Sequence, residues 1–215
     1  MSEAKRFENA EIILASASPR RREMLERAGL AITVHPSHIE EKYRGAESAE
    51  AYVLRNAEEK ARHVARMIPS MSGQYANRHL VIGADTVVVL ADRILEKPRD
   101  HEHARAMLMA LSGRMHRVIT GVCALGLGFS DATVEKTFAV ATEVEFKILS
   151  ESEIQAYIAT GEPMDKAGAY AIQERGASMI RRINGSYTNV VGLPLSELMD
   201  TLEKDFGLSL HAFPG

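Results

Sequence analysis

Residues 80–90, LVIGADTVVVL, decide the fold because they form the most apolar strand-like run of the chain. A strand with one face in water alternates apolar and polar residues, whereas a buried central strand is apolar on both faces. Asp85 interrupts the run, and a buried carboxylate is costly unless it is paired, hydrogen-bonded or bound to a metal. Lys97, just before Pro98, is a candidate partner. Alternatively, Asp85 and Lys97 both face a cleft, where a carboxylate and an ammonium bind a metal–phosphate substrate.

Strands and helices alternate before this run. Ser18 and Pro19 supply an N-cap and a favoured first helical residue, and Gly29 ends that helix, while Pro69 stops the next one. The pattern predicts strands at 11–15 and 31–35, helices at 19–28 and 48–68, and a polar loop at 70–79.

The second half of the chain continues the alternation. Two β-rich runs flank a polar turn at Ser130-Asp131 and predict an antiparallel hairpin. Ser150 and Glu153 form a capping box at the start of a helix. The pattern predicts helices at 100–113, 150–161 and 195–206, hairpin strands at 116–128 and 133–149, strands at 169–172 and 178–183, and a Gly/Asn-rich loop at 184–194. We therefore expect an α/β fold with a mixed sheet that does not split into sequence-continuous domains.

Composition excludes several classes of protein. The formal net charge is −3 and no long basic run is present, which argues against a general nucleic-acid or membrane-surface binder. A single cysteine, Cys123, excludes a disulfide framework and lies in an apolar run, where a buried hydrophobe is expected. No apolar stretch reaches the length of a membrane span, and residues 1–10 lack the apolar core of a signal peptide. We expect a soluble, cytoplasmic protein.

Residues 14–25, LASASPRRREML, place polar side chains where a strand ends and a helix begins. Cations there face the positive end of the helix dipole, which is unfavourable. Ser16, Ser18, Arg20 and Arg21 would be well placed around an anion such as phosphate, which would remove that penalty. The alternative is a solvated basic turn.

Two further stretches contain polar residues that the predicted turns and strands do not explain. In residues 160–176, TGEPMDKAGAYAIQERG, a turn delivers Asp165 and Lys166, and Gln173 follows an apolar strand. Glu40 and Glu41 are paired carboxylates that suit Mg²⁺, although an acidic surface loop explains them equally well. The HEH at 101–103 has a possible metal spacing but falls in the first turn of an amphipathic helix, so we expect no metal there.

The chain resembles the Maf family of nucleoside triphosphate pyrophosphatases. Five motifs in order carry the resemblance: LASASPRRREML, GADTVVVLADRILEKPRD, MLMALSGRMHRVITGV, GEPMDKAGAYAIQ and INGSYTNVVGLPL. The resemblance implies one Maf-like domain over residues 1–215, with residues 1–10 as an N-terminal extension. It also implies an elongated mixed sheet flanked by helices, with two lobes and a central substrate cleft, as in inosine triphosphate pyrophosphatases.

The resemblance also implies an activity and a set of site residues. Members hydrolyse a nucleoside triphosphate to the monophosphate and pyrophosphate with Mg²⁺, or with Mn²⁺ or Co²⁺ in its place. Asp85 matches the proton acceptor, and Glu40, Glu41 and Asp85 are the implied metal ligands. The implied substrate-binding residues are Ser16, Arg20, Arg21, Lys60, Thr86, Lys97, Asp165, Lys166 and Gln173. A homodimer is expected from the resemblance alone.

The motifs resemble the branch of the family that hydrolyses dTTP and UTP. Arg20, Thr86 and Gln173 match the positions that distinguish this branch. A Gln amide can accept from N3–H and donate to O4 of uracil or thymine in one bidentate contact, although CTP is not excluded by this argument. Glu174 stands where the family usually has Gly, so a positive φ there would strain the loop. HIEE at 38–41 replaces the more usual VDE.

We therefore predict a Mg²⁺-dependent dTTP/UTP pyrophosphatase that also accepts modified pyrimidine nucleotides. A phosphatase or nucleotidyl transferase would share the cationic site but release orthophosphate or form a new ester. A nucleotide-binding regulator of cell division without turnover is the alternative outside enzymology.

Overall fold

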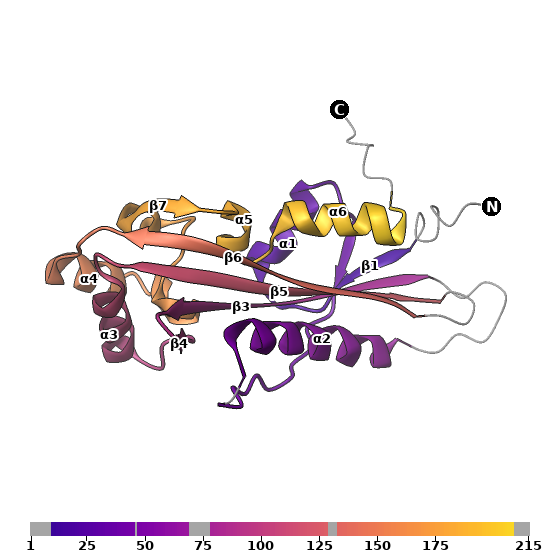
Figure 1. Ribbon diagram of the computed structural model, residues 1–215, viewed down its shortest axis with the longest axis horizontal. Helices are drawn as coiled ribbons and strands as arrows, with labels where there is room; N and C mark the ends of the chain where they lie inside the picture. The colour runs from indigo at the N-terminus through magenta and orange to yellow at the C-terminus, as the bar shows by residue number, and fades with distance from the viewer. Residues whose placement is uncertain (1–9, 46, 69–77, 129–132, 209–215) are drawn as a thin grey trace. The chain divides into compact units, whose positions relative to one another are not determined.

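A computed structural model describes residues 10–45, 47–68, 78–128 and 133–208. These residues form a seven-stranded sheet in the order β2-β1-β3-β5-β6-β7, with β4 paired to β3 (Figure 1). β1 is parallel to both β2 and β3, whereas β4 is antiparallel to β3 and β7 is antiparallel to β6. The predicted class, an α/β fold with a mixed sheet flanked by helices, is confirmed.

The chain falls into two compact units, each built from separated stretches of sequence. Unit 1 comprises Met1–Asp85, Gly121–Ala139 and Gly192–Gly215, and unit 2 comprises Thr86–Thr120 and Val140–Val191. The long strands β3 (His79–Leu90), β5 (Met115–Leu127) and β6 (Val134–Phe146) each contribute residues to both units.

Unit 1 contains the parallel part of the sheet. Its strands are β1 (Glu11–Leu14), β2 (Ile32–Val34) and the adjoining parts of the three long strands. Helix α2 (Ala49–Met67) lies on one face of these strands, and α1 (Pro19–Arg27) and α6 (Leu195–Phe206) lie on the other (Figure 1). Side chains of β1, of Ala15 directly after it, and of β3 and β5 pack with those of α2. The core that they form consists of Ile13, Ala15, Ala57, Ala61, Val64, Val81, Cys123 and Leu125.

Two glycines bring α2 close to the sheet. A Cβ at Gly83 would lie 2.2 Å from the carbonyl oxygen of Ala57, and one at Gly121 would lie 2.5 Å from that of Val53. Only glycine permits this separation, because backbone atoms of the helix occupy the space that a side chain would need. Polar groups on the inner face of α2 are therefore held close to β3.

Unit 2 has its own core, which includes Val88, Leu108, Phe146, Tyr157 and Tyr170. Its other elements are β4 (Arg93–Leu95), α3 (His101–Leu111), α4 (Glu151–Ile158), β7 (Ile180–Asn184), α5 (Tyr187–Val191) and three short 3-10 helices, η2 (Glu162–Asp165), η3 (Ala167–Ala169) and η4 (Arg175–Met179). Helix α3 packs beside α4.

The predicted helix starts are confirmed by the caps. The side chains of Ser18, Ser48, Asp100 and Ser150 each accept a hydrogen bond from a backbone N–H in the first turn of their helix. Ser150 and Glu153 form the complete capping box that the sequence indicates. The two hairpin runs are neighbours in the sheet as β5 and β6, but the turn at Ser130-Asp131 lies outside the described residues, as does most of the predicted loop at 70–79.

Two predictions of secondary structure are wrong. Residues 169–172 do not form a strand, because Gly168 and Ala169 have φ of 67° and 61° and turn the chain through η3. The predicted loop at 184–194 contains the short helix α5, at whose start the Ser186 hydroxyl accepts from Asn189 N at 3.2 Å. Among the described helices, none combines the length and the apolar composition that crossing a membrane requires.

Candidate active site

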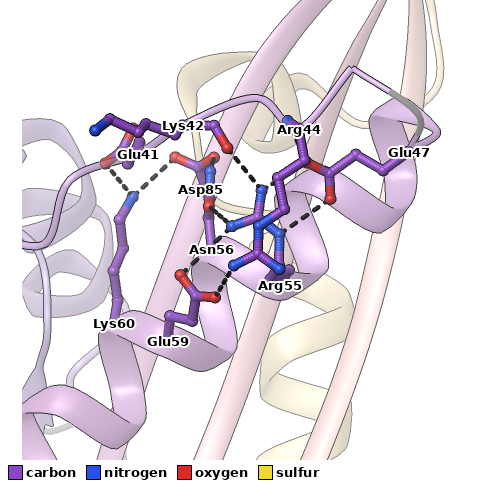
Figure 2. A network of polar contacts seen from close by, with 9 residues as sticks. All are labelled: Glu41, Lys42, Arg44, Glu47, Arg55, Asn56, Glu59, Lys60 and Asp85. Atoms are coloured by element: carbon purple, nitrogen blue, oxygen red, sulfur yellow. Dashed lines mark hydrogen bonds and ion pairs between the residues drawn. The ribbon is translucent and has the colours of Figure 1, made fainter.

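Asp85, on β3, is held in unit 1 by two donors from α2 (Figure 2). Lys60 Nζ donates to its Oδ1 at 2.8 Å, and Asn56 Nδ2 donates to its Oδ2 at 2.8 Å. The residue is 5% exposed. The sequence required a partner for this buried carboxylate, and Lys60 supplies the charge that was sought in Lys97.

Lys60 brings a second carboxylate to the same place. Its ammonium contacts Glu41 Oε1 at 2.7 Å and also donates to the carbonyl of Ala84 at 3.2 Å. Lys60 is buried between the helix and the sheet, whereas the sequence alone would place it on the helix surface. Two acidic side chains from a loop and a strand therefore meet at one cation, while Glu41 itself remains 40% exposed.

Arg21 is buried and held by protein acceptors. Its Nε donates to Gly192 O at 2.7 Å, and its Nη1 donates to Ala84 O at 2.9 Å and to Ser16 Oγ at 3.0 Å. Burial lowers the pKa of the Arg21 guanidinium, while the nearby carboxylates of Asp85 and Glu41 act in the opposite direction. Arg21 is therefore part of the packed structure and also lies near the carboxylates of Asp85 and Glu41.

The other two arginines of the run differ from Arg21. Arg22 is exposed and pairs with Glu26 one turn later, at 2.7 Å. Arg20 is half-buried, and its charge is close enough to Arg21 to lower the pKa of that guanidinium further. Arg22 is not one of the residues that the sequence places around an anion, and its cation is balanced by Glu26. An anion contact stays a prediction for Arg20 and Arg21, although Arg21 also has acceptors within the protein.

Five candidates lie in unit 2. The Thr86 and Thr120 hydroxyls share a hydrogen bond of 2.9 Å. Lys166 is buried, forms an ion pair with Asp165 and donates to Glu162 O at 3.4 Å. Lys97 and Gln173 are exposed.

A carboxylate and a phenol hold the segment that carries Gln173. The Tyr157 hydroxyl donates to Glu162 Oε1 at 2.8 Å and accepts from Ala171 N at 3.1 Å. Glu162 also accepts from the backbone N–H groups of Arg175 and Gly176, both at 3.2 Å. Glu174 has a φ of −113°, so the strain expected of a non-glycine residue there does not arise.

The implied metal ligands are only partly brought together. Glu41 and Asp85 share the Lys60 ammonium, whereas Glu40 is exposed and pairs with Lys42 at 2.8 Å. Across the described part of the chain, no three His, Cys, Asp or Glu side chains are arranged to hold a metal, which includes the HEH at 101–103. Mg²⁺ commonly takes one or two carboxylates and completes its shell with phosphate and water, and Glu41 with Asp85 fits that requirement.

Sequence reasoning missed Asn56 and the carbonyl of Ala84. The signal for Asn56 was present, because this amide stands on the apolar face of α2 beside Val53 and Ala57 and is fully buried. A buried amide needs partners for its donors and its acceptor, which marks it as a residue to examine. No sequence pattern indicates which carbonyl a buried lysine or arginine will contact.

Comparison with known proteins gives the same family from independent evidence. The model of a family described as "Maf-like protein" matches residues 11–205. A dTTP/UTP pyrophosphatase of Anaeromyxobacter sp. (strain Fw109-5) is 48% identical over 193 residues, which cover 90% of this chain and 88% of that protein. One of Yersinia pestis bv. Antiqua (strain Antiqua) is 48% identical over 191 residues, 89% of this chain and 91% of that protein. The solved structure of a HAM1 protein from Coxiella burnetii is similar with a TM-score of 0.39 and 20% identity, over 64% of this chain and 73% of that one.

Proposed function

Because the chain belongs to the Maf family, we propose that it is a pyrophosphatase that hydrolyses dTTP and UTP, and modified pyrimidine nucleotides, to the monophosphate and pyrophosphate. The observation that carries the proposal is the meeting of Arg21, Lys60, Glu41 and Asp85 in unit 1 of such a chain. The relatives that are about 48% identical over nine-tenths of the chain support the choice of substrates.

Asp85 is the proposed general base. A carboxylate has about four lone-pair sites, and Lys60 and Asn56 occupy one on each oxygen, which leaves acceptor capacity for a water molecule. This water loses a proton to Asp85, its oxygen bonds to a phosphorus of the α–β linkage, and the bond to the bridging oxygen breaks. The two donors hold the carboxylate in place for this transfer.

Cationic side chains are proposed to bind the triphosphate. In unit 1 these are Arg20, Arg21 and Lys60, with the Ser16 hydroxyl beside them, and in unit 2 they are Lys97 and Lys166. A triphosphate carries several negative charges, and positioned cations both bind it and stabilise the charge that develops in the transition state. In this proposal Asp165, the ion-pair partner of Lys166, orients that ammonium.

A divalent cation is proposed at Glu41 and Asp85, with Glu40 as the weaker candidate because it pairs with Lys42. When bound, Mg²⁺ would neutralise phosphate charge and orient the reacting linkage. Lys60 would then exchange part of its contact with the two carboxylates for contact with phosphate. Carboxylate oxygens also suit Mn²⁺, and Co²⁺ is the third proposed ion for the same two ligands.

Gln173 is proposed to recognise the pyrimidine edge. Its side chain is exposed. Tyr157 and Glu162 bind backbone N–H groups on either side of it, so the backbone that carries the amide is fixed in position. An amide can donate to O4 and accept from N3–H of thymine or uracil at the same time. We assign Arg20 and Thr86 to the same discrimination. A cytoplasmic homodimer completes the proposal.

Product analysis tests the proposed function. The purified chain is incubated with each common nucleoside triphosphate and Mg²⁺, and nucleotide, pyrophosphate and orthophosphate are quantified. We expect equimolar monophosphate and pyrophosphate, fastest with dTTP and UTP. Orthophosphate with a diphosphate product would indicate a phosphatase instead, and intact nucleotide after long incubation would support the non-catalytic regulator of cell division.

A further inference from the structure

Arg55, on α2, anchors the loop that carries Glu41 (Figure 2). Its Nη2 donates to Lys42 O at 3.0 Å and to Glu47 Oε1 at 2.6 Å, and its Nε donates to Glu47 Oε2 at 3.0 Å. The Arg55 and Glu47 side chains are 17% and 15% exposed, so this forked ion pair is largely withdrawn from water. The loop and the helix are thus joined next to the candidate active site.

The same guanidinium also contacts Asn56. Arg55 Nη1 donates to Asn56 Oδ1 at 3.1 Å, and Asn56 Nδ2 donates to Asp85 Oδ2 at 2.8 Å. The chemistry of the partners fixes this orientation, because a guanidinium has only donors and an ionised carboxylate has only acceptors. A flipped amide would place N–H against N–H and oxygen against oxygen, in a fully buried position.

We propose that Arg55 is a positioning residue for hydrolysis: by fixing the amide orientation of Asn56, it directs a donor at Asp85 and holds that carboxylate for reaction. This inference rests on the role proposed for Asp85. Arg55 touches neither reacting group: it acts on Asp85 through Asn56, and it holds the Glu41 loop through Glu47 and Lys42. A lysine at position 55 can keep the ion pair that holds the loop, so the two routes are separable.

A double-mutant cycle separates these two influences. Arg55→Lys keeps the charge and can still pair with Glu47, but a single ammonium cannot reproduce the fork that reaches Glu47 and Asn56 together. Asn56→Leu removes the donor to Asp85 in a side chain that suits the apolar face of α2. Each single change should lower kcat with dTTP about 10-fold to 100-fold and leave KM nearly unchanged, as removal of a supporting hydrogen bond typically does.

The kcat of the double variant, compared with that of each single variant, tests the proposal. If Arg55 acts through Asn56, adding Arg55→Lys to Asn56→Leu causes no further loss of kcat, while the melting temperature still falls further because the contact of Arg55 with Lys42 O is also weakened. Multiplication of the two losses of kcat would overturn the proposal. Arg62→Lys is the matched control, because Arg62 lies on the same helix and pairs with Glu135 at 2.7 Å, away from Asn56. It should leave kcat unchanged.

A measurement without nucleotide or metal tests the orientation directly. In the ¹⁵N-labelled, metal-free chain, the side-chain NH₂ signals of Asn56 are identified by their loss in Asn56→Leu. We expect slow hydrogen exchange for these protons in the parent and in Arg62→Lys, and faster exchange in Arg55→Lys. Equal exchange in parent and Arg55→Lys would overturn the inference, and because this measurement needs no turnover, its failure is distinct from failure of the proposed pyrophosphatase activity.

Discussion

Three consecutive arginines begin α1, yet each has a different environment. Arg21 is buried with backbone and hydroxyl acceptors, Arg22 pairs on the surface with Glu26, and Arg20 is half-buried with its charge close to that of Arg21. A helix N-terminus repels cations, so each arginine needs a favourable contact, with a hydrogen-bond acceptor or an anion, that offsets the repulsion. The acceptors of Arg21 and the carboxylate of Glu26 do this in the protein itself, and a phosphate is proposed to do so for Arg20.

Alanine substitution should separate the three roles. Arg20→Ala should lower kcat/KM for dTTP by about 1.5–3 kcal/mol in transition-state terms with an unchanged melting temperature, because a charge-assisted contact to phosphate is lost. Arg21→Ala should lower the melting temperature as well, since the carbonyls of Gly192 and Ala84 lose a buried donor. Arg22→Ala should change neither quantity and is the control. Equal kinetic losses in Arg20→Ala and Arg22→Ala would contradict a phosphate contact at Arg20.

Asp85→Asn tests the general base, but the substitution also disturbs hydrogen bonding, and this effect on stability must be separated from the effect on turnover. With the new amide oxygen toward Lys60, its NH₂ would face the NH₂ of Asn56, so stability should fall. The exchange variant Asp85→Asn/Asn56→Asp restores a complementary pair and the charge. We expect it to recover the melting temperature but not turnover, with kcat about 10²–10⁴-fold below the parent. Recovery of kcat in the exchange variant would show that the base need not stand at position 85.

His116 should give the chain an acid-sensitive stability. Burial lowers the pKa of His116 from 6.5 to about 4, and its Nε2 shares a hydrogen bond of 2.8 Å with the Tyr170 hydroxyl. Protonation therefore favours the unfolded chain, so the contribution is complete above about pH 6.5 and is lost as the pH falls toward 4, with a total of about 3 kcal/mol. Urea unfolding of the parent and His116→Gln over this range should show a shallower pH slope in the variant. Parallel slopes would contradict the assignment.

At the scale of elements, α2 determines the site, because its inner face carries Asn56 and Lys60 and its separation from the sheet is set by Gly83 and Gly121. The helix itself was predictable from apolar spacing and the Ser48 cap. Its distance from β3 was not, since a glycine inside an apolar strand indicates a close approach without naming what approaches. For the same reason the sequence marks Asp85 as unusual but cannot identify Lys60 as its partner.

The element-scale prediction concerns Gly83→Ala. Its methyl group would meet the carbonyl oxygen of Ala57 at 2.2 Å and Ala61 N at 2.9 Å, and backbone atoms cannot rotate away. Overpacking of this kind typically costs about 1–3 kcal/mol, and here it should also displace Lys60 from Asp85 and lower kcat. In the control, Gly161→Ala, nothing lies within 4 Å, and only the backbone cost of a φ of +75° remains. Retention of full kcat by Gly83→Ala would contradict the role of this packing.

Two elements show where sequence patterns stop being informative. Residues 169–172 are apolar and largely buried like a strand, but Gly168 has a positive φ and leaves no room for a Cβ beside Val88, so tertiary packing overrides the local pattern. Helix α5 is too short for periodicity, and its sequence, YTNVV, consists of aromatic, β-branched and Asn residues that have low helix propensity. The longer helices were predictable from several turns of apolar spacing, to which α1, α2, α3 and α4 add a side-chain cap at the start.

At the scale of the whole molecule, a chain with a formal net charge of −3 is proposed to bind a polyanion. Attraction must therefore be local, and binding should stabilise the folded chain by mass action. A non-hydrolysable α,β-imido analogue of dTTP with Mg²⁺, at 100 times its Kd, should add about 2.7 kcal/mol of stability. For a chain of this size that is a rise in melting temperature of roughly 5–10 °C. The matching ATP analogue at the same concentration should give a smaller rise, and an equal rise would argue against recognition of the base.

The hydrogen bond from Arg21 to Gly192 joins positions 171 residues apart. A ribosome delivers the chain from its N-terminus, so the guanidinium emerges long before its acceptor is made. Unit 2 ends at Val191, whereas unit 1 still awaits the stretch that begins at Gly192 and contains α6. In a nascent chain, β1 can therefore pair with β2 and β3 long before Gly192 is made, whereas the Arg21 guanidinium of α1 must wait for that late carbonyl to complete its native hydrogen bonding.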